Sequence, residues 1–422
     1  MIKPNILGID FGTSNSAAGV TVGDKPHLIE VEARKTTIPT SLFFDFDAQK
    51  ILYGRSANNA LIEGYEGRFM RALKSILGTS LMHEKRRMMG ETLSFSDIIS
   101  RFLKEIKHRA ESACNQEFDT ALSGRPVYFH SDNTAKDAQA LADLTQCYLK
   151  AGFNDVHFMY EPEAAAIANH TSNDAGKTGL IVDIGGGTSD FCLFKSKEIG
   201  IDILASHGVR VGGTNFDKSI SVDHVMPLLG KGSDIRNEMG TGVLTTPNAL
   251  FQDLATWEKI PFLYSAENRR IVKNMHRLAV DKPLFARLES ILEYELAHEM
   301  AFAVERGKIF INNGLYDNST VDLEFIERDL GVTISKAEMT GSLMAHAQKI
   351  QSCASETLKL ANVPATSVDM IIFVGGSSFM SVVETAMVEL FPSAVMRYAD
   401  AFTAIVDGLA LASSSLETYK VN

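Results

Sequence analysis

Short apolar runs separated by turn-forming residues open the chain. They occupy residues 6–9, 17–22 and 28–31, and the first gap, residues 12–15, contains glycine and asparagine. Apolar runs of this length between turn formers are typical of β-strands joined by tight turns. The pattern therefore predicts three short strands in residues 5–31.

The same pattern returns in the middle of the chain. A polar stretch at residues 169–179 predicts a linker, and an apolar run, a glycine loop and two further strand-like runs follow at residues 179–206. Because repeated order of elements indicates two copies of one structural unit, the sequence predicts an internal repeat.

Helical periodicity fills much of the remaining sequence. Apolar positions recur every three or four residues at 94–113 and 135–151, and residues 215–330 are predicted to be mostly helical, with a long helix near 288–311. Ser335 and Glu338 form a capping-box pattern that opens a helix to about residue 360.

The last part of the chain returns to a strand. An apolar run at 370–374 precedes a glycine loop, a helix that stops before Pro392 and a final helix at 403–412.

Composition argues against several classes of protein, namely nucleic-acid-binding, disulfide-rich, zinc-ribbon and membrane proteins. The chain has 422 residues, 45% hydrophobic and 22% charged, which suits two or three domains. A net charge of −11 disfavours binding to nucleic acid. The four cysteines form no C-x-x-C pair, so neither a disulfide framework nor a zinc ribbon is expected. We find no signal-peptide pattern and no apolar run near the ~20 residues that a membrane span needs. A cytoplasmic protein without membrane contact is expected.

Two acidic glycine loops follow apolar strands directly. These motifs are Asp10-x-Gly12-Thr13 and Asp183-x-Gly185-Gly186-Gly187-Thr188. Glycine lets backbone N–H groups approach a phosphate closely, and a carboxylate at the strand end can hold Mg²⁺ directly or through water. One such loop alone is more typical of a tight hairpin. A pair in matched strand context favours a phosphate site.

Two further glycine loops indicate a phosphate site less strongly. Gly375-Gly376-Ser377-Ser378 follows a strand and opens a helix, where unpaired N–H groups can bind an anion. Gly212-Gly213-Thr214 follows the second repeat, and an ordinary turn explains it at least as well.

Taken together, these motifs resemble those of the DnaK-like seventy-kilodalton heat-shock chaperones. Residues 8–16 and 183–190 are similar to the two phosphate loops of that family, and residues 374–378 to its adenosine loop. Residues 161–166 are similar to its connecting segment, and residues 212–217 to a further loop. The order and approximate spacing agree over nearly the whole chain, and the nearest resemblance is to the YegD-like branch, which lacks a peptide-binding domain.

The resemblance implies an α/β actin-like ATPase fold. Two lobes, each with a ribonuclease-H-like core, would enclose an ATP cleft between them. Lobe I is expected at residues 1–172, with a C-terminal helix in 395–422 that packs back on it. Lobe II is expected at 178–394, with a helical insertion at about 217–310.

The resemblance also implies catalytic residues. By position, Lys74 matches the family's catalytic lysine, Glu161 a residue that orders water or metal, and Thr188 and Asp190 groups that place the attacking water. Asp10 and Asp183 match the residues that hold Mg²⁺, through water, and Asp183 is expected to be catalytic as well. Without the resemblance, a lone lysine is more often a solvated surface charge.

The remaining carried-over positions are expected to contact the nucleotide. They are Asp10, Gly12, Thr13, Ser14, Asn15, Gly185, Gly186, Gly187, Gly212, Gly213, Thr214, Glu305, Lys308, Asn312, Gly375, Gly376, Ser377 and Phe379.

Three positions depart from the family pattern around the adenosine. Ile309 and Phe379 stand where the family has arginine, and Asn312 stands where it has serine. One hypothesis is that Phe379 stacks on the adenine. The alternative is that Phe379 is a core residue and purine selectivity is relaxed.

The implied function is slow hydrolysis of Mg-ATP to ADP and phosphate, with lobe closure acting on a protein client or co-chaperone in trans. A monomer is expected. Pro126 matches a relay proline, but Thr134 stands at the relay arginine. The sequence after the last motif is too short for a peptide-binding domain, so peptide clamping in cis is not expected. The alternatives are a nucleotide sensor without turnover, an actin-like scaffold and a small-molecule kinase.

Overall fold

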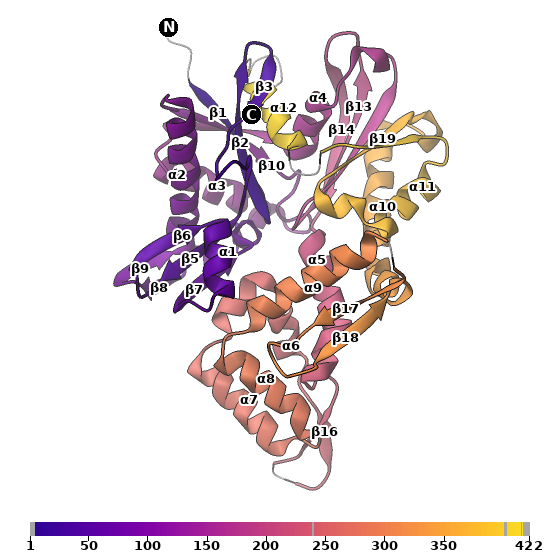
Figure 1. Cartoon of the computed structure of the whole chain (residues 1–422). Coiled ribbons are helices and arrows are strands. Elements are labelled where there is room, and N and C mark those ends of the chain that lie inside the picture. The colour runs from indigo at the N-terminus through magenta and orange to yellow at the C-terminus, as the bar shows by residue number, and fades with distance from the viewer. Residues whose placement is uncertain (1–4, 239, 315, 401–402, 415, 417–422) are drawn as a thin grey trace. The chain divides into compact units, whose positions relative to one another are not determined.

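A computed structural model describes the chain apart from residues 1–4, 239, 315, 401–402, 415 and 417–422 (Figure 1). Contacts divide it into two compact units. One unit comprises residues 1–213 and 347–422, and the other residues 214–346. The lobe boundaries expected at 172 and 178, and the insertion at 217–310, stay predictions.

The first sheet of the larger unit contains the strands predicted at the start of the chain. Its order is β11-β10-β1-β2-β3, and β4 also pairs with β2. β1, β10 and β11 are parallel, whereas β1, β2 and β3 are antiparallel. The strands are β1 (Ile6–Phe11), β2 (Asn15–Val22), β3 (Lys25–Leu28), β4 (Thr37–Pro39), β10 (Thr120–Arg125) and β11 (Asp155–Tyr160).

The second sheet of this unit repeats the first. Its order is β14-β13-β12-β19-β20, with β12, β13 and β14 antiparallel and β12, β19 and β20 parallel. The strands are β12 (Thr178–Ile184), β13 (Ser189–Ser196), β14 (Ile201–Val209), β19 (Met370–Val374) and β20 (Val395–Tyr398). The predicted internal repeat is confirmed, and this duplicated α/β architecture fits the actin-like ATPase fold.

Two helices of small residues pack between the sheets. α12 (Ala404–Ser413) contacts β1, β2 and β3, and α4 (Glu161–Ala168) contacts β12, β13 and β14 (Figure 1). The two helices cross so closely that a Cβ added to Gly408 would lie 1.8 Å from the carbonyl oxygen of Ala164. Alanine and glycine at this crossing allow one helix layer to serve both sheets.

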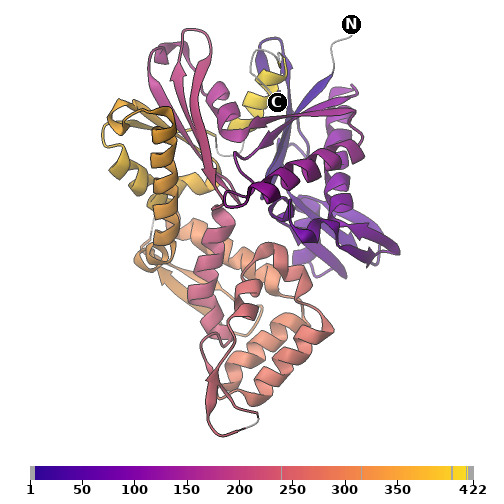
Figure 2. The ribbon, with the colours of Figure 1, turned by 180° about the vertical axis from the view of Figure 1, so that it is seen from behind.

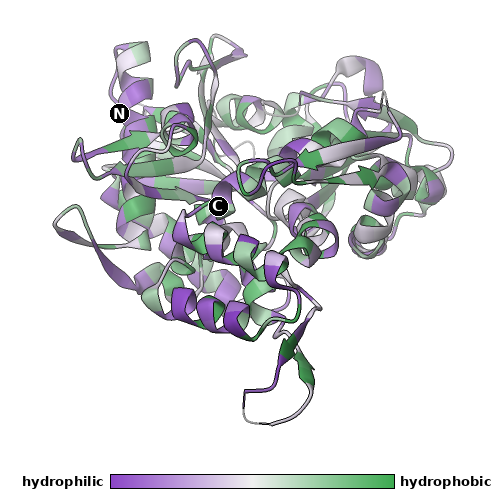
Figure 3. Cartoon of the chain, turned by 60° about the horizontal axis from the view of Figure 1, so that its bottom comes forward, coloured by the Kyte–Doolittle hydropathy of each residue, from purple (hydrophilic) through white to green (hydrophobic). Residues whose placement is uncertain are grey.

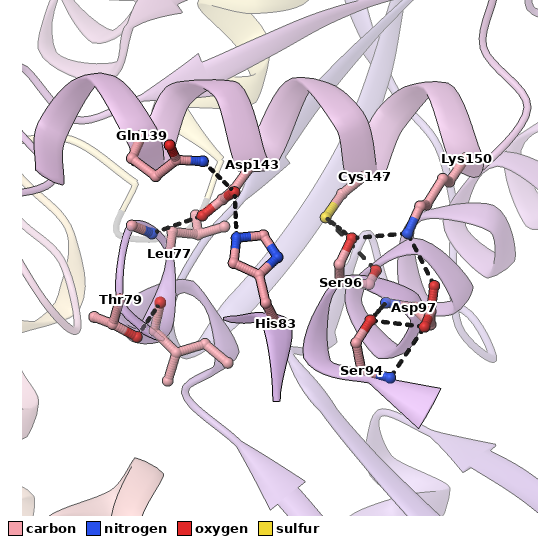
Figure 4. Close-up of polar contacts among 12 residues, drawn as sticks. Leu77, Thr79, His83, Ser94, Ser96, Asp97, Gln139, Asp143, Cys147 and Lys150 are labelled. Carbon is pink, nitrogen blue, oxygen red and sulfur yellow. Dashed lines mark hydrogen bonds and ion pairs between the residues drawn. The ribbon is translucent and has the colours of Figure 1, made fainter. Parts of the chain in front are cut away.

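Two predicted helices cover the first sheet. α2 (Phe95–Cys114) and α3 (Thr134–Lys150) pack against each other, and their bounds agree with the predicted ranges within a residue. Ser94 and Asp97 form a capping box at the start of α2, and Lys150 of α3 lies 2.9 Å from Asp97 (Figure 4).

The rest of this unit includes elements for which the sequence pattern carried no prediction. A small sheet of order β6-β5-β7 packs with α1, and β8 and β9 form a hairpin. Their bounds are β5 (Ser41–Asp45), β6 (Lys50–Tyr53), α1 (Arg55–Ile62), β7 (Gly67–Arg71), β8 (Lys85–Met88) and β9 (Glu91–Ser94). Two single turns, η1 (Leu73–Ile76) and η2 (Ser80–His83), connect β7 to β8.

The C-terminal helices follow the prediction. The capping box at Ser335 and Glu338 opens α10 (Lys336–Ala361), in which the backbone N–H of Glu338 donates to Ser335 Oγ at 3.2 Å. η8 (Gly376–Phe379) and α11 (Ser381–Leu390) follow β19. α10 and α11 lie side by side (Figures 1 and 2), joined by a 3.1 Å hydrogen bond from Gln351 Nε2 to the Ala386 carbonyl.

The smaller unit is mostly helical, as predicted, and has its own core. Its helices are banded in hydrophilic and hydrophobic colours (Figure 3), and they bury side chains such as Phe251, Trp257 and Phe285. Its elements are α5 (Gly213–Ile220, beginning at the junction of the units), α6 (Ala249–Leu254), α7 (Ala266–Leu278), α8 (Lys282–Glu293), α9 (Ala297–Asn312) and the hairpins β15 (Asp234–Arg236) with β16 (Val243–Thr245) and β17 (Asn318–Asp322) with β18 (Gly331–Ser335).

The single long helix predicted near residues 288–311 is wrong. The structure has α8 and α9 instead, and the chain turns between them at Glu295, whose φ of 57° is left-handed. One residue in that conformation breaks a right-handed helix, and the apolar periodicity on either side does not reveal it.

No described helix has both the length and the hydropathy of a membrane span.

Candidate functional site

The two acidic glycine loops meet in the larger unit. The first loop joins β1 to β2, and the second joins β12 to β13. A Cβ added to Gly186 would lie 2.6 Å from Ser14 Oγ, and one added to Gly187 would lie 3.1 Å from Thr13 Oγ1. A side chain at either position would force these hydroxyls to shift, so glycine favours this approach, which places the backbone of the second loop against the hydroxyls of the first.

The two weaker glycine loops pack against the second acidic loop. The Gly213 N–H donates to the Gly185 carbonyl at 2.9 Å, and a Cβ on Gly212 would lie 2.6 Å from the carbonyl carbon of Gly186. Gly375, with a φ of 80°, lies so that a Cβ would be 2.9 Å from Asp183 Oδ1. Four loops from distant parts of the sequence thus converge around one point.

Lys74 lies beside these loops in a buried ion pair. Its Nζ is 2.5 Å from Glu161 Oε1, and the two residues are only 8% and 6% exposed. Burial lowers the pKa of Lys74, but the negative charges of Glu161 and Asp10 outweigh it, so the pKa is raised and the ammonium stays charged. Lys74 is therefore not a solvated surface charge, the alternative that its sequence context alone would favour.

Three carboxyl groups surround the ion pair: Asp183 and Asp190 are buried, and Asp10 is partly buried. Burial, and next the charge of Glu161, raise the pKa of Asp10 to about 7, against the opposing effect of Lys74. The pKa of Asp190 is also raised to about 7, with the same two leading causes, although the Val127 N–H donates to its Oδ1 at 2.7 Å. Burial raises the pKa of Asp183 well above its ordinary value. The site therefore concentrates negative charge that a cation would stabilise.

The donors present fit Mg²⁺. Asp183 Oδ1 is buried and makes no hydrogen bond within the described part of the chain, and Asp10 is close enough to add to the rise of its pKa. Among the described residues, no group of three or more His, Cys, Asp or Glu is arranged to hold a metal alone. Mg²⁺ typically takes one or two protein carboxylates and completes its shell with water and phosphate oxygens.

A small pocket opens beside Lys74 and the two acidic loops. Ser75, His130 and Arg210 line it, and the sequence pattern did not single out any of the three. Arg210 precedes the Gly212 loop by two residues, which is the only local signal that could have identified it. The full lining is Thr13, Lys74, Ser75, Leu77, Pro126, Phe129, His130, Gly187, Thr188 and Arg210.

The expected adenosine contacts are divided between the two units. Glu305, Lys308 and Asn312 lie on α9 in the smaller unit. Lys308 is buried there, with its Nζ 2.7 Å from Asp217 Oδ1. Thr214, on α5, belongs to the same unit.

Phe379 lies in the larger unit with Gly375, Gly376 and Ser377. It ends η8, is partly buried, and makes an edge contact with Tyr398 at 5.8 Å between ring centroids. Partial burial leaves both the stacking hypothesis and the core alternative for Phe379 open to experiment.

Comparison with known proteins identifies a matching family model and several related chaperones. The family model described as Hsp70 protein matches residues 6–242. Chaperone protein DnaK of Halobacterium salinarum is 25% identical over 407 residues, covering 92% of this chain and 52% of that protein. The protein of the same name from Methanothermobacter thermautotrophicus is 24% identical over 423 residues, covering 97% and 59%. That from Thermoplasma volcanium is 31% identical over 247 residues, covering 56% and 38%. The chain thus spans about half the length of the first two relatives.

Proposed function

Since the chain belongs to the Hsp70 family, whose model covers residues 6–242, we propose that it is a chaperone-type nucleotide-binding domain that binds ATP and hydrolyses it to ADP and phosphate. The observation that carries the proposal is the convergence of two glycine loops on a buried lysine and on three carboxyl groups, of which Asp183 and Asp190 are buried. Glycine loops bind phosphates through backbone N–H groups, and the lysine supplies the positive charge that phosphoryl transfer requires.

The loops would hold the phosphates. Gly185, Gly186 and Gly187 would contribute backbone groups, and Thr13 and Ser14, which lie against Gly187 and Gly186, would contribute hydroxyl groups. Asp10 and Asp183 would hold Mg²⁺ through water, and the ion would neutralise phosphate charge when bound.

Lys74, Asp190 and Thr188 would serve the chemical step. The Lys74 ammonium would stabilise charge that develops on the transferred phosphoryl group, while Glu161 keeps it charged and directed. Asp190, held by the Val127 N–H, would orient the attacking water together with Thr188. Because its pKa is raised to about 7, the Asp190 carboxylate is basic enough to accept a proton from the attacking water at neutral pH, as a general base does.

We also propose how ATP hydrolysis would be used in the cell. Opening and closing of the nucleotide cleft would act on a protein client or co-chaperone in trans, in the cytoplasm and as a monomer. The resemblance to the YegD-like branch and the slow rate are also predictions.

The test is single-turnover hydrolysis of Mg-ATP, with nucleotide binding measured in parallel. Lys74→Ala should keep most of its binding and lose about 10²-fold or more in the hydrolysis rate, the scale seen when a group that stabilises transition-state charge is removed. Lys150→Ala is the matched control, because Lys150 lies on the surface of α3, where it pairs with Asp97 of α2. If wild type and Lys74→Ala both bind without turnover, the nucleotide-sensor alternative holds and the catalytic assignments fall.

A further inference from the structure

We propose that Arg210 is a positioning residue for hydrolysis, and that together with His130 it holds in place the single turn that carries Lys74. The inference rests on the proposed function, because it assigns a role within that reaction.

The guanidinium of Arg210 reaches the Lys74 turn directly. One terminal nitrogen donates to the carbonyl oxygen of Ser75 at 2.6 Å, and the other lies 2.7 Å from Nδ1 of His130. Ser75 is the residue after Lys74 in η1. Arg210 thus contacts the backbone of the catalytic turn from 135 residues away in the sequence.

His130 extends this contact to a second carbonyl. Its Nε2 lies 2.7 Å from the carbonyl oxygen of Leu77, three residues after Lys74. A carbonyl oxygen only accepts, so Nε2 must carry the proton and Nδ1 must accept from Arg210. The neutral ring agrees with its surroundings, since burial and the charges of Arg210 and Lys136 lower the pKa of His130, against the opposing effects of the Leu77 hydrogen bond and Asp137.

The Lys74 turn requires such support. η1 is one short 3₁₀ turn, a conformation with poor hydrogen-bond geometry of its own, and it follows Ala72, whose φ of 59° is left-handed. Just after the turn, Asp143 of α3 accepts from the Gly78 N–H at 3.0 Å (Figure 4). Asp143 and the Arg210–His130 pair therefore both hold the segment that follows Lys74.

Arg210 is itself firmly placed. It follows β14 and precedes Gly212, which packs against the second phosphate loop. Through Arg210, the loop that contacts the phosphates is joined to the turn that carries the lysine. Loss of this link should displace Lys74 relative to the phosphates without removing any group expected to bind the nucleotide.

The experiment measures single-turnover rate and nucleotide affinity separately in Arg210→Ala, His130→Ala and the double variant. We expect each single variant to lose about 10- to 100-fold in rate, because small displacements of a catalytic group have effects of this size. Affinity for Mg-ATP should change less than about threefold. The double variant should be no slower than the slower single variant, because both side chains act through one brace.

A second measurement does not depend on activity. Hydrogen exchange of the Ser75, Leu77 and Thr79 amides, which bond within the turn, should be faster in Arg210→Ala than in wild type. Arg210→Lys, which keeps the charge but lacks the two-armed guanidinium, serves if the alanine variant folds poorly, and it should also be slow. Arg328→Ala, at an exposed arginine, is the control.

Distinct outcomes overturn distinct claims. A wild-type rate in Arg210→Ala would overturn the positioning role. A wild-type rate in His130→Ala together with a slow Arg210→Ala would also overturn it, because the Arg210 charge would then act on the reaction directly. A large loss of affinity in Arg210→Ala would overturn it as well. If wild type itself shows no turnover, the proposed function fails and this inference fails with it.

Discussion

At the scale of single residues, the glycines differ in why a side chain would be unfavourable. Some pack against neighbouring backbone, whereas others have space beside them that a ligand could occupy. A Cβ on Gly212 would lie 2.6 Å from the backbone of Gly186, whereas the nearest atom to a Cβ on Gly185 is the Thr188 carbonyl oxygen at 3.9 Å. A backbone neighbour cannot rotate away as a side chain can, so a Cβ at Gly212 would have to displace the second acidic loop.

We therefore expect Gly212→Ala to lower the free energy of unfolding by about 1–3 kcal/mol, the usual range for overpacking, and Gly185→Ala to leave it nearly unchanged. Chemical denaturation without nucleotide measures both. Equal stability losses would contradict the contact geometry. A Gly185→Ala variant that folds normally but loses affinity for ATP would indicate that a phosphate lies against this glycine.

Phe379 carries the prediction about the adenine. If its ring stacks on the base, Phe379→Ala should weaken ATP binding about two- to tenfold, in line with the ~0.5–1.5 kcal/mol of an aromatic contact. Titration calorimetry with Mg-ATP would measure this. Tyr398→Phe is the control, because it keeps the ring that Phe379 contacts and removes only the hydroxyl bonded to Glu384. Unchanged affinity in Phe379→Ala would favour the core alternative.

At the scale of secondary-structure elements, an ion pair joins a single turn to the edge of the second sheet. Asp174, at the end of η3 (Ser172–Asp174), accepts hydrogen bonds from both terminal nitrogens of Arg397 on β20, at 2.7 and 2.9 Å. Arg397 above all, followed by Lys177 and Thr171, lowers the pKa of Asp174. The folded state therefore binds the proton more weakly than the unfolded state.

The sign of the pH dependence follows from that shift. The stabilisation is fully present above the unfolded pKa, near 3.9, and is lost as the pH falls from there towards the lower folded pKa. Asp174→Asn should cost about 1–3 kcal/mol at pH 7 and less at pH 3. Denaturant unfolding at both pH values checks this, with the exposed Asp202→Asn as control. A cost that is the same at pH 3 and pH 7 would argue against the ion pair as its source.

At the scale of the whole molecule, ligand binding distinguishes an ATPase domain from a scaffold. A ligand that binds only the folded state at 100 times its Kd adds about 2.7 kcal/mol, so Mg-ATP should raise the thermal midpoint by a few degrees. Removal of Mg²⁺ with EDTA should reduce this shift, because Asp10 and Asp183 would then face the phosphates without a cation. Light scattering should stay constant when ATP is added. Scattering that rises with protein concentration would instead favour the actin-like scaffold.

Local patterns were sufficient for the strands of the repeated unit, for the helices α2, α3 and α10, and for the duplication itself. Strand-like runs on either side of the linker, the capping box at Ser335 and the Asp-Gly loops are all features of neighbouring residues, so they could be interpreted before any contact was known. The resemblance then supplied the order of the loops. Glu295 marks the limit of this approach, because one left-handed residue divides a periodic stretch into two helices without altering the periodicity.

Long-range contacts required the folded chain. Lys74 meets Glu161 across 87 residues, and Arg210 meets Ser75 across 135. Such pairs depend on the register of two sheets and on the close crossing of α4 and α12, which arise from packing of the entire core. Periodicity reports only which face of an element is buried. It carries no information on which distant element covers that face, and for that reason the support of the lysine turn was visible only in three dimensions.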